Sequence, residues 1–255
     1  MLLAVDAGNT QTVLGLFEDS ALGEEWRIAT DVNRTGDELG ALVDTLLRAR
    51  GLCRDTVTAL ALSSVVPALN REYVRMARRY FGVEPLVVGP GVKTGMPIMT
   101  SNPRELGADL IVDAVAAFET VGGPCVVVDF GTATTFGAVS AKGEYLGHAI
   151  APGIQTAMDA LAARAAKLPR VELVDPGTVI GKTTVHSMQA GAVFGFAGQV
   201  DGLVTRMRAE LGAPRAVSVA TGGLASLIFD HAATLDRLDE HLTLRGLEII
   251  HRRNQ

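Results

Sequence analysis

Two segments of this chain share one plan, and this internal repeat constrains the fold more than any other feature. Residues 2–17 read LLAVDAGNTQTVLGLF and residues 125–139 read CVVVDFGTATTFGAV. In each, an apolar run ending in Asp predicts a buried strand, a nearby glycine predicts a tight turn, and a second strand follows. A third strand is expected after each pair, at residues 25–29 and 144–148. The chain therefore contains two copies of one β-hairpin unit.

Helices and further strands alternate around the two copies, as in an α/β fold. Apolar residues at helical spacing predict helices at residues 35–50, 70–81, about 109–120, 156–166, 185–211 and 225–231. Buried strands are expected at residues 56–67, 86–88 and 217–220. The copies then belong to duplicated lobes, residues 1–122 and 123–255, with a boundary at the Gly122-Gly123-Pro124 turn.

Composition argues against several classes of function. The net charge is −5 and no run of Lys or Arg could follow a nucleic-acid backbone, so no nucleic-acid partner is expected. The N-terminus reaches Asp6 after a short apolar stretch without a basic flank, so we expect neither a signal peptide nor a membrane span, and a cytoplasmic protein. Cys53 and Cys125 lie in no metal or disulfide pattern and are expected to be small buried hydrophobes.

The first turn, Asp6-Ala7-Gly8-Asn9-Thr10, has the chemistry of a phosphate site. Gly8 lets the backbone turn its N–H groups outward, where they join the side chains of Asn9 and Thr10 as donors. Asp6 repels a phosphate, so its expected role is to hold Mg²⁺, or a water on Mg²⁺, beside the phosphate oxygens. A hairpin turn without any ligand would have a similar sequence.

The second turn, residues 129–135, favours nucleotide binding, because two such turns at the ends of matching strands can face one another across a cleft. Later, Thr221-Gly222-Gly223 follows a buried strand and precedes a helix, which suits close approach of an adenosine or a phosphate. An ordinary strand-to-helix turn would look much the same. Residues 177–183, GTVIGKT, imitate a P-loop, but only three residues separate the glycines and no strand precedes them, so we reject a P-loop there.

Asp109 stands at the start of the predicted helix that runs to about Thr120. An acidic residue at that position commonly interacts with the positive end of the helix. A carboxylate there can also accept the proton of an alcohol as a phosphoryl group arrives, which is the task of the base in a kinase. The local pattern leaves both roles open.

Five motifs in this order resemble those of the type III pantothenate kinases. They are Asp6 to Thr10, Asn102 to Asp109, Asp129 to Thr135, a turn at Gly147 to Gly153, and Thr221 to Gly223. The resemblance implies two duplicated ribonuclease H-like lobes of the actin-like ATPase superfamily, with a nucleotide cleft between them. It also implies a homodimer that phosphorylates pantothenate with ATP to 4'-phosphopantothenate, the first step of coenzyme A biosynthesis.

The same resemblance assigns roles to individual residues. ATP, with Mg²⁺, would bind Asp6, Ala7, Gly8, Asn9, Thr10, Gln11, Thr12, Val13 and Thr132. Pantothenate would contact Gly107, Ala108, Asp109, Leu110 and Thr184, with Asp109 as the catalytic base. A monovalent cation, K⁺ or NH₄⁺, would bind Asp129.

Leu110 departs from the family pattern, which has Arg immediately after the Asp. The change removes a permanent charge and a fork of donors beside the acceptor. Two alternatives therefore stay open: a kinase of another small alcohol, and a non-catalytic nucleotide-binding regulatory relative. Arg104 can substitute for the missing charge. Asp6, Asp109 and Asp129 together favour an enzyme, because a pure binding module needs no base at Asp109.

Overall fold

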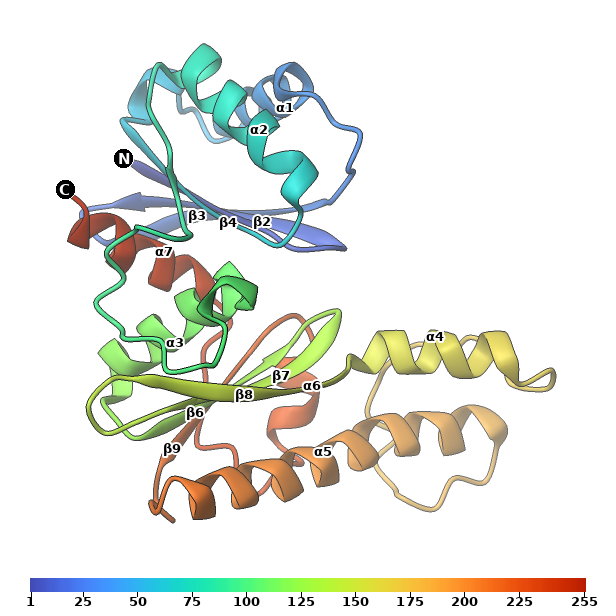
Figure 1. Ribbon diagram of the computed structural model, residues 1–255. Coiled ribbons are helices and arrows are strands. Elements are labelled where there is room, and N and C mark those ends of the chain that lie inside the picture. Colours follow the sequence, from blue (N-terminus) through green and yellow to red (C-terminus); the bar gives the residue numbers. More distant parts are fainter. The chain divides into compact units, whose positions relative to one another are not determined.

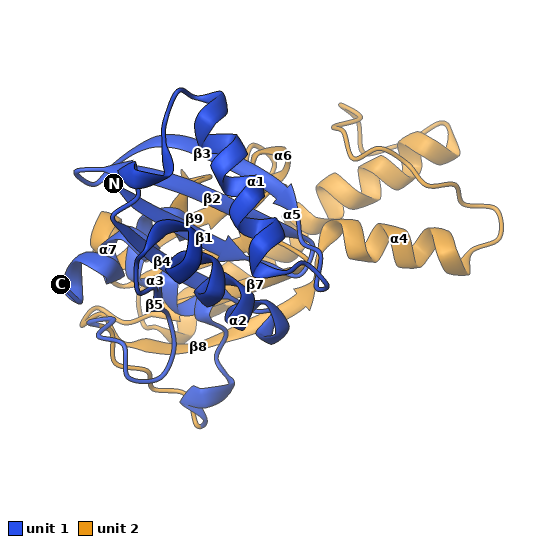
Figure 2. Ribbon diagram, turned by 90° about the horizontal axis from the view of Figure 1, so that it is seen from above, with its two compact units in different colours: residues 1–95, 102–116, 243–255 blue, residues 96–101, 117–242 orange.

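The computed structural model describes residues 1–255, and contacts within the chain form two compact units. Unit 1 comprises residues 1–95, 102–116 and 243–255, and unit 2 comprises residues 96–101 and 117–242 (Figure 2). Each unit contains one of the two predicted hairpins. This division by contacts differs from a single cut after residue 122, because the C-terminal residues join unit 1. The predicted boundary between duplicated lobes stays a prediction.

Unit 1 is built on a five-stranded sheet with the order β3-β2-β1-β4-β5 (Figure 1). Its strands are β1 (Leu2–Ala7), β2 (Gln11–Glu18), β3 (Ala21–Ala29), β4 (Ala59–Ser64) and β5 (Leu86–Val87). β1, β2 and β3 are antiparallel neighbours, whereas β4 pairs in parallel with both β1 and β5. The first hairpin and its third strand are thus confirmed.

Helices α1 (Gly36–Ala49) and α2 (Pro67–Met76) cover one face of this sheet, and α2 continues into a π-helical turn, η2 (Ala77–Phe81). Two short 3₁₀ turns, η1 (Arg54–Thr56) and η3 (Pro103–Glu105), lie in the connections. α1 begins at a capping box, in which Thr35 Oγ1 accepts from Glu38 N (3.3 Å) and Glu38 accepts from Thr35 N (2.8 Å). The predicted helices at residues 35–50 and 70–81 are confirmed, although the second begins earlier, at Pro67.

Helix α7 (Leu242–Arg253) was not predicted. Gly246 lies against Val112 of helix α3 (Ala108–Val121), so closely that a Cβ on residue 246 would overlap the Val112 backbone. The side chain of Leu244 likewise packs against Gly15 of β2, where it would overlap a Cβ on residue 15. A glycine inside a helix costs about 1 kcal/mol relative to alanine, which masks the helical pattern, but here the glycine permits close packing of two helices.

Unit 2 repeats the topology of unit 1, with the order β10-β9-β6-β7-β8. Its strands are β6 (Cys125–Phe130), β7 (Ala133–Val139), β8 (Tyr145–Pro152), β9 (Val217–Thr221) and β10 (Arg237–Leu238). β6, β7 and β8 are antiparallel neighbours, and β9 pairs in parallel with β6 and β10. The predicted duplication is therefore present in the strand order as well as in the sequence.

The predicted turn at residues 147–153 is wrong over most of its length. Residues 147–152 belong to β8 and pair with residues 133–138 of β7. Gly147 lies where the register shifts, and this irregularity accommodates a glycine without ending the strand. Only Gly153 lies outside β8, as the residue that precedes the next helix.

Helices α4 (Ile154–Arg164), α5 (Thr184–Glu210) and α6 (Ala225–Phe229) complete unit 2, and α4 runs beside the first half of α5 (Figure 1). All three match predicted helices. Cys125 is buried, as expected, whereas Cys53 is exposed, so the expectation for that cysteine was wrong. None of the helices combines the length and the apolar character needed to cross a membrane.

Candidate functional site

The first D-x-G turn joins β1 to β2 in unit 1. It is closed by a hydrogen bond from Gly8 N to Gln11 O (3.1 Å), and a Cβ on residue 8 would lie only 2.9 Å from that oxygen. The side chains of Asn9, Thr10 and Gln11 are exposed. The turn therefore presents polar groups to solvent, as a phosphate site requires.

The neighbouring predicted ATP residues differ in what they can offer. Ala7 and Thr12 are buried, and Val13 is half-buried. The side chains of Ala7 and Thr12 face protein atoms rather than open solvent, so any contact that these two residues make with a nucleotide has to come from the backbone.

Thr30, directly after β3, holds this turn in place, and no motif in the sequence points to it. Its N–H donates to Thr10 O (3.0 Å) and its hydroxyl donates to Gly8 O (2.8 Å). The same hydroxyl lies 2.9 Å from Thr12 Oγ1. Three contacts from one threonine thus fix the shape of the turn before any ligand binds.

The carboxylate of Asp6 has an unusual electrostatic environment. The pKa of Asp6 is raised to about 7, chiefly by burial and in addition by the nearby charge of Asp109. The hydroxyl of Ser63, which pairs with Asp6 across β1 and β4, acts in the opposite direction. The Ser63 hydroxyl is buried and makes no hydrogen bond of good geometry, so this lowering effect is weak. A carboxylate and a hydroxyl are hard oxygen ligands, which fit Mg²⁺.

Asp109 is the second residue of α3 and is half-buried. Its Oδ1 accepts a hydrogen bond from Leu110 N (2.8 Å), and the absence of a side chain on Gly107 leaves room for that oxygen. Because Asp109 raises the pKa of Asp6, unit 1 brings the predicted metal-holding carboxylate and the predicted base within electrostatic reach of each other. Leu110 is half-buried, and Arg104 is exposed on η3.

The second D-x-G turn, in unit 2, is one residue shorter than the first. Only Gly131 and Thr132 separate β6 from β7, and Gly131 N donates to Ala133 O (3.1 Å). Gly222, with φ of 95°, follows β9, and a Cβ there would overlap the Asp129 carboxylate. The glycine after Thr221 is therefore required because the chain passes directly over Asp129.

Helix α4 begins at this second turn. Gly153 N donates to Thr132 O (3.1 Å), and the Thr156 hydroxyl donates to the same oxygen (2.8 Å). A Cβ on Gly153 would overlap the carbonyl oxygens of Gly131 and Thr132. The positive end of an 11-residue helix thus lies beside Thr132, where it favours an anion.

Thr184, the remaining predicted substrate residue, is exposed at the start of α5. Thr183 caps this helix by accepting from His186 N (3.2 Å). No strand lies between α4 and α5, which agrees with the rejection of a P-loop at residues 177–183. Thr184 belongs to unit 2, whereas Gly107 to Leu110 belong to unit 1.

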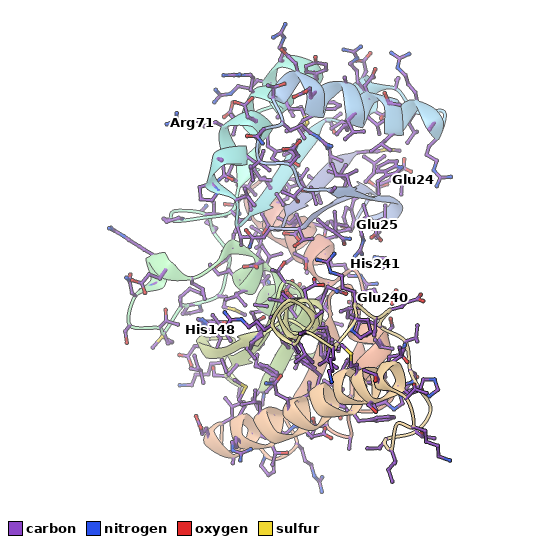
Figure 3. All side chains as sticks on the ribbon, turned by 90° about the vertical axis from the view of Figure 1, so that its right-hand side faces the viewer. Glu24, Glu25, Arg71, His148, Glu240 and His241 are labelled. Carbon is purple, nitrogen blue, oxygen red and sulfur yellow. The ribbon has the colours of Figure 1, made fainter.

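A surface hollow of about 580 Å³ lies elsewhere on unit 1, along α2 and η2. It is lined by Asn70, Arg71, Val74, Arg75, Arg78 and Arg79. Arg71 points outward from the protein (Figure 3). None of the lining residues belongs to a D-x-G turn or to the start of α3, so the hollow is separate from the candidate site.

Comparison with known proteins gives consistent matches over the whole chain. The family model for type III pantothenate kinases matches residues 2–206. The type III pantothenate kinase of Moorella thermoacetica is 56% identical over 254 residues, covering 100% of both chains. That of Myxococcus xanthus is 57% identical over 254 residues, covering 100% of this chain and 99% of the relative.

Solved structures with low sequence identity share the fold. A candidate 2-dehydro-3-deoxygalactonokinase from Sinorhizobium meliloti superposes with a TM-score of 0.64 at 12% identity, covering 99% of this chain and 96% of that one. Ethanolamine utilization protein EutJ from Carboxydothermus hydrogenoformans gives a TM-score of 0.57 at 15% identity, covering 97% and 89%. These matches confirm the predicted fold class, the ribonuclease H-like α/β fold of actin-like ATPases and sugar kinases.

Proposed function

Because this chain belongs to the type III pantothenate kinase family, we propose that its D-x-G turns and Asp109 perform that family's reaction. The chain is a kinase that phosphorylates pantothenate with ATP, the first step of coenzyme A biosynthesis. It uses ATP together with a divalent metal ion. The full-length similarity does not favour a regulatory relative or a kinase of another alcohol.

The proximity of Asp6 and Asp109 is the observation that carries the assignment of the site. Asp6 ends a strand beside exposed turn donors, and Asp109 is near enough to raise its pKa. Two acidic groups in one place suit a reaction in which one holds a metal ion and the other accepts a proton. Bound Mg²⁺ would neutralise charge on the phosphate oxygens.

In the proposed mechanism, the backbone of residues 6–13 and the side chains of Asn9 and Thr10 donate hydrogen bonds to the ATP phosphates. Thr132 is a further ATP contact that the family resemblance implies. Asp109 accepts the proton of the pantothenate hydroxyl as that oxygen attacks the terminal phosphorus, and the bond to the ADP oxygen breaks. Residues 107–110 and Thr184 orient pantothenate.

An ADP-release assay with purified protein tests this function. We expect turnover with pantothenate that requires ATP and Mg²⁺, and a product with the mass of 4'-phosphopantothenate. A panel of other small alcohols serves as the comparison. Turnover with one of those alcohols and none with pantothenate would contradict the proposal.

We further propose that Asp129 binds a monovalent cation, K⁺ or NH₄⁺. Its carboxylate is half-buried, at the end of β6 and directly beneath the chain at Gly222. We expect turnover to fall at least about tenfold when Na⁺ replaces K⁺ at constant ionic strength. The smaller, more strongly hydrated Na⁺ would not fill a site sized for K⁺, and the positive charge next to the phosphates would then be lost. Asp129→Asn should abolish the difference between the two salts. Equal wild-type rates in K⁺ and Na⁺ would contradict the assignment.

Leu110 sets a limit on the affinity for pantothenate if no other cation replaces the family's arginine. We expect Leu110→Arg to lower the KM for pantothenate about tenfold for each 1.4 kcal/mol regained, without a change in ATP affinity. Steady-state kinetics with varied pantothenate measures this effect, and Leu110→Met is the matched control without charge. An unchanged KM would indicate that another group already compensates for the missing charge.

A homodimer also fits the structure of unit 2. Positions Gly191, Gly195 and Gly198 of α5 have open space where a side chain would be, so another helix can approach closely. Val179 and Ile180, in the segment before α5, are exposed apolar residues. The cytoplasmic location inferred from the N-terminal sequence stays a prediction.

A further inference from the structure

An arginine with an unused buried donor lies in the segment that leads from β3 into α1. Arg34 is half-buried, and its Nη1 atom has no contact with solvent and no hydrogen-bond partner. A guanidinium carries five donors and stays charged at every physiological pH. Burying a donor of such a group without a hydrogen-bond partner costs free energy, so the position of Arg34 does not stabilise the fold and suggests a role in ligand binding.

The carboxylates of the same segment make their hydrogen bonds and ion pairs to other groups. The pKa of Glu38 is lowered chiefly by hydrogen bonds from Thr35 and in addition by the nearby charge of Arg34. Glu38 accepts from the N–H and the hydroxyl of Thr35 (2.8 and 2.9 Å), Asp31 accepts from Asn33 N (3.0 Å), and Asp37 pairs with Arg79 (3.0 Å). None of these carboxylates accepts a hydrogen bond from Arg34 Nη1, so that donor is unused within the chain.

Arg34 lies close to the D-x-G-N-T turn. Thr30, four residues before it, is hydrogen-bonded to Gly8 and Thr10 of that turn. The buried hydroxyl of Tyr73 gives a second link, because its pKa is raised chiefly by burial, lowered by the charge of Arg34 and raised by that of Asp6. One hydroxyl thus lies within electrostatic reach of both Arg34 and Asp6.

The turn itself needs a cation. Residues 6–13 contain no Lys or Arg, and their only charged side chain is the carboxylate of Asp6. A triphosphate at this turn would contact backbone N–H groups, polar side chains and the carboxylate of Asp6, and Mg²⁺ would be the sole positive charge beside it. A guanidinium complements phosphate oxygens with parallel N–H donors, and charge-assisted bonds of this kind are about twice as strong as neutral ones.

We propose that Arg34 is a phosphate-binding residue of this kinase, donating hydrogen bonds from its guanidinium to the ATP phosphates held at the first D-x-G turn. This inference rests on the proposed function in so far as ATP is the ligand. It adds a contact from the loop between β3 and α1 to those from the turn.

Equilibrium binding of ATP, without pantothenate, tests the proposal in the full-length protein. We expect Arg34→Gln to weaken ATP affinity by about tenfold to a hundredfold, because a charge-assisted contact is lost. Arg34→Lys keeps the charge without the planar fork, so its affinity should be intermediate. Arg71→Gln, at an exposed arginine on α2 with no ion pair, is the matched control and should bind ATP as the wild type does.

Thermal unfolding of the ligand-free variants separates ligand binding from a structural role. Arg34 makes no hydrogen bond through its side chain, so Arg34→Gln should unfold at the wild-type temperature or above it. Three results would overturn the proposal: unchanged ATP affinity, a clear loss of ligand-free stability or of folding, and weakened binding of pantothenate alone. Wild-type turnover of pantothenate is measured separately, and its absence would refute the proposed function without affecting the ATP-binding result.

Discussion

Asp109→Asn should lower kcat by about a hundredfold to ten-thousandfold while ATP binds nearly as well as before. Asparagine keeps the shape of the side chain but cannot accept the hydroxyl proton, and general bases contribute rate factors of about that size. The loss should appear in kcat and kcat/KM together, since the interaction exists only in the transition state. Steady-state kinetics and calorimetric titration with ATP measure the two quantities.

Glu105→Gln is the matched control for Asp109→Asn. Glu105 is an exposed carboxylate on η3 that accepts from Asn102 Nδ2 (2.6 Å), and it precedes the same helix. Its neutralisation should leave kcat within about twofold of wild type. Full activity in Asp109→Asn would show that Asp109 serves only the start of α3 and that the base is another residue.

Asp6→Asn should lower Mg²⁺-dependent turnover by at least about a hundredfold without impairing folding. The substitution removes the charge that holds the metal ion beside the phosphates, and electrostatic positioning supplies most of phosphoryl-transfer catalysis. Initial rates over a range of Mg²⁺ concentrations measure the loss. Asp55→Asn, at an exposed carboxylate of η1, is the control and should have the wild-type rate. Wild-type turnover in Asp6→Asn would contradict a metal-holding role.

The same substitution should stabilise the ligand-free protein at alkaline pH. Folding raises the pKa of Asp6 from an ordinary value of 3.8 to about 7, so between these pH values the native state holds a proton that the unfolded state has lost. Stability therefore falls as the pH rises from about 4 to 7, and above pH 7 the ionised carboxylate costs roughly 4 kcal/mol. Because solvent reaches part of Asp6, we expect the free energies of unfolding of Asp6→Asn and wild type to differ by about 2 kcal/mol above pH 7.

Chemical denaturation at several pH values, without Mg²⁺ or ATP, measures this effect. Asp6→Asn should be more stable than wild type at pH 8, and the difference should shrink towards zero near pH 4. A variant less stable than wild type at pH 8 would contradict the raised pKa. Together the two results would describe a residue that lowers stability so that it can bind a metal ion.

The sequence was most informative where local chemistry and periodicity agree. The D-x-G hairpins, their third strands and helix α1 follow from apolar runs, turn glycines and the capping box at Thr35. The sequence shows the motifs that contain Gly222 and Gly153 but not why glycine is needed there. Both glycines allow the chain to pass close to the second D-x-G turn, and this proximity exists only in the tertiary structure.

The elements that were predicted wrongly or not at all also have physical explanations. Gly147 and its neighbours form a strand because pairing with β7 overrides the turn preference of glycine. Helix α7 was hidden by Gly246, and Leu247, Ile250 and the basic residues at its end were the signals that could have revealed it. Thr30 belongs to no motif, and its importance depends on hydrogen bonds with a turn some twenty residues earlier in the chain.

The return of residues 243–255 to unit 1 has a consequence for how the protein is made. Leu244, Gly246 and Asn254 contact Gly15, Val112 and Lys93, so the last helix completes a unit that began with the first strand. A ribosome synthesises β1 first and α7 last, with all of unit 2 in between. Unit 1 therefore cannot be completed until all of unit 2 has been synthesised.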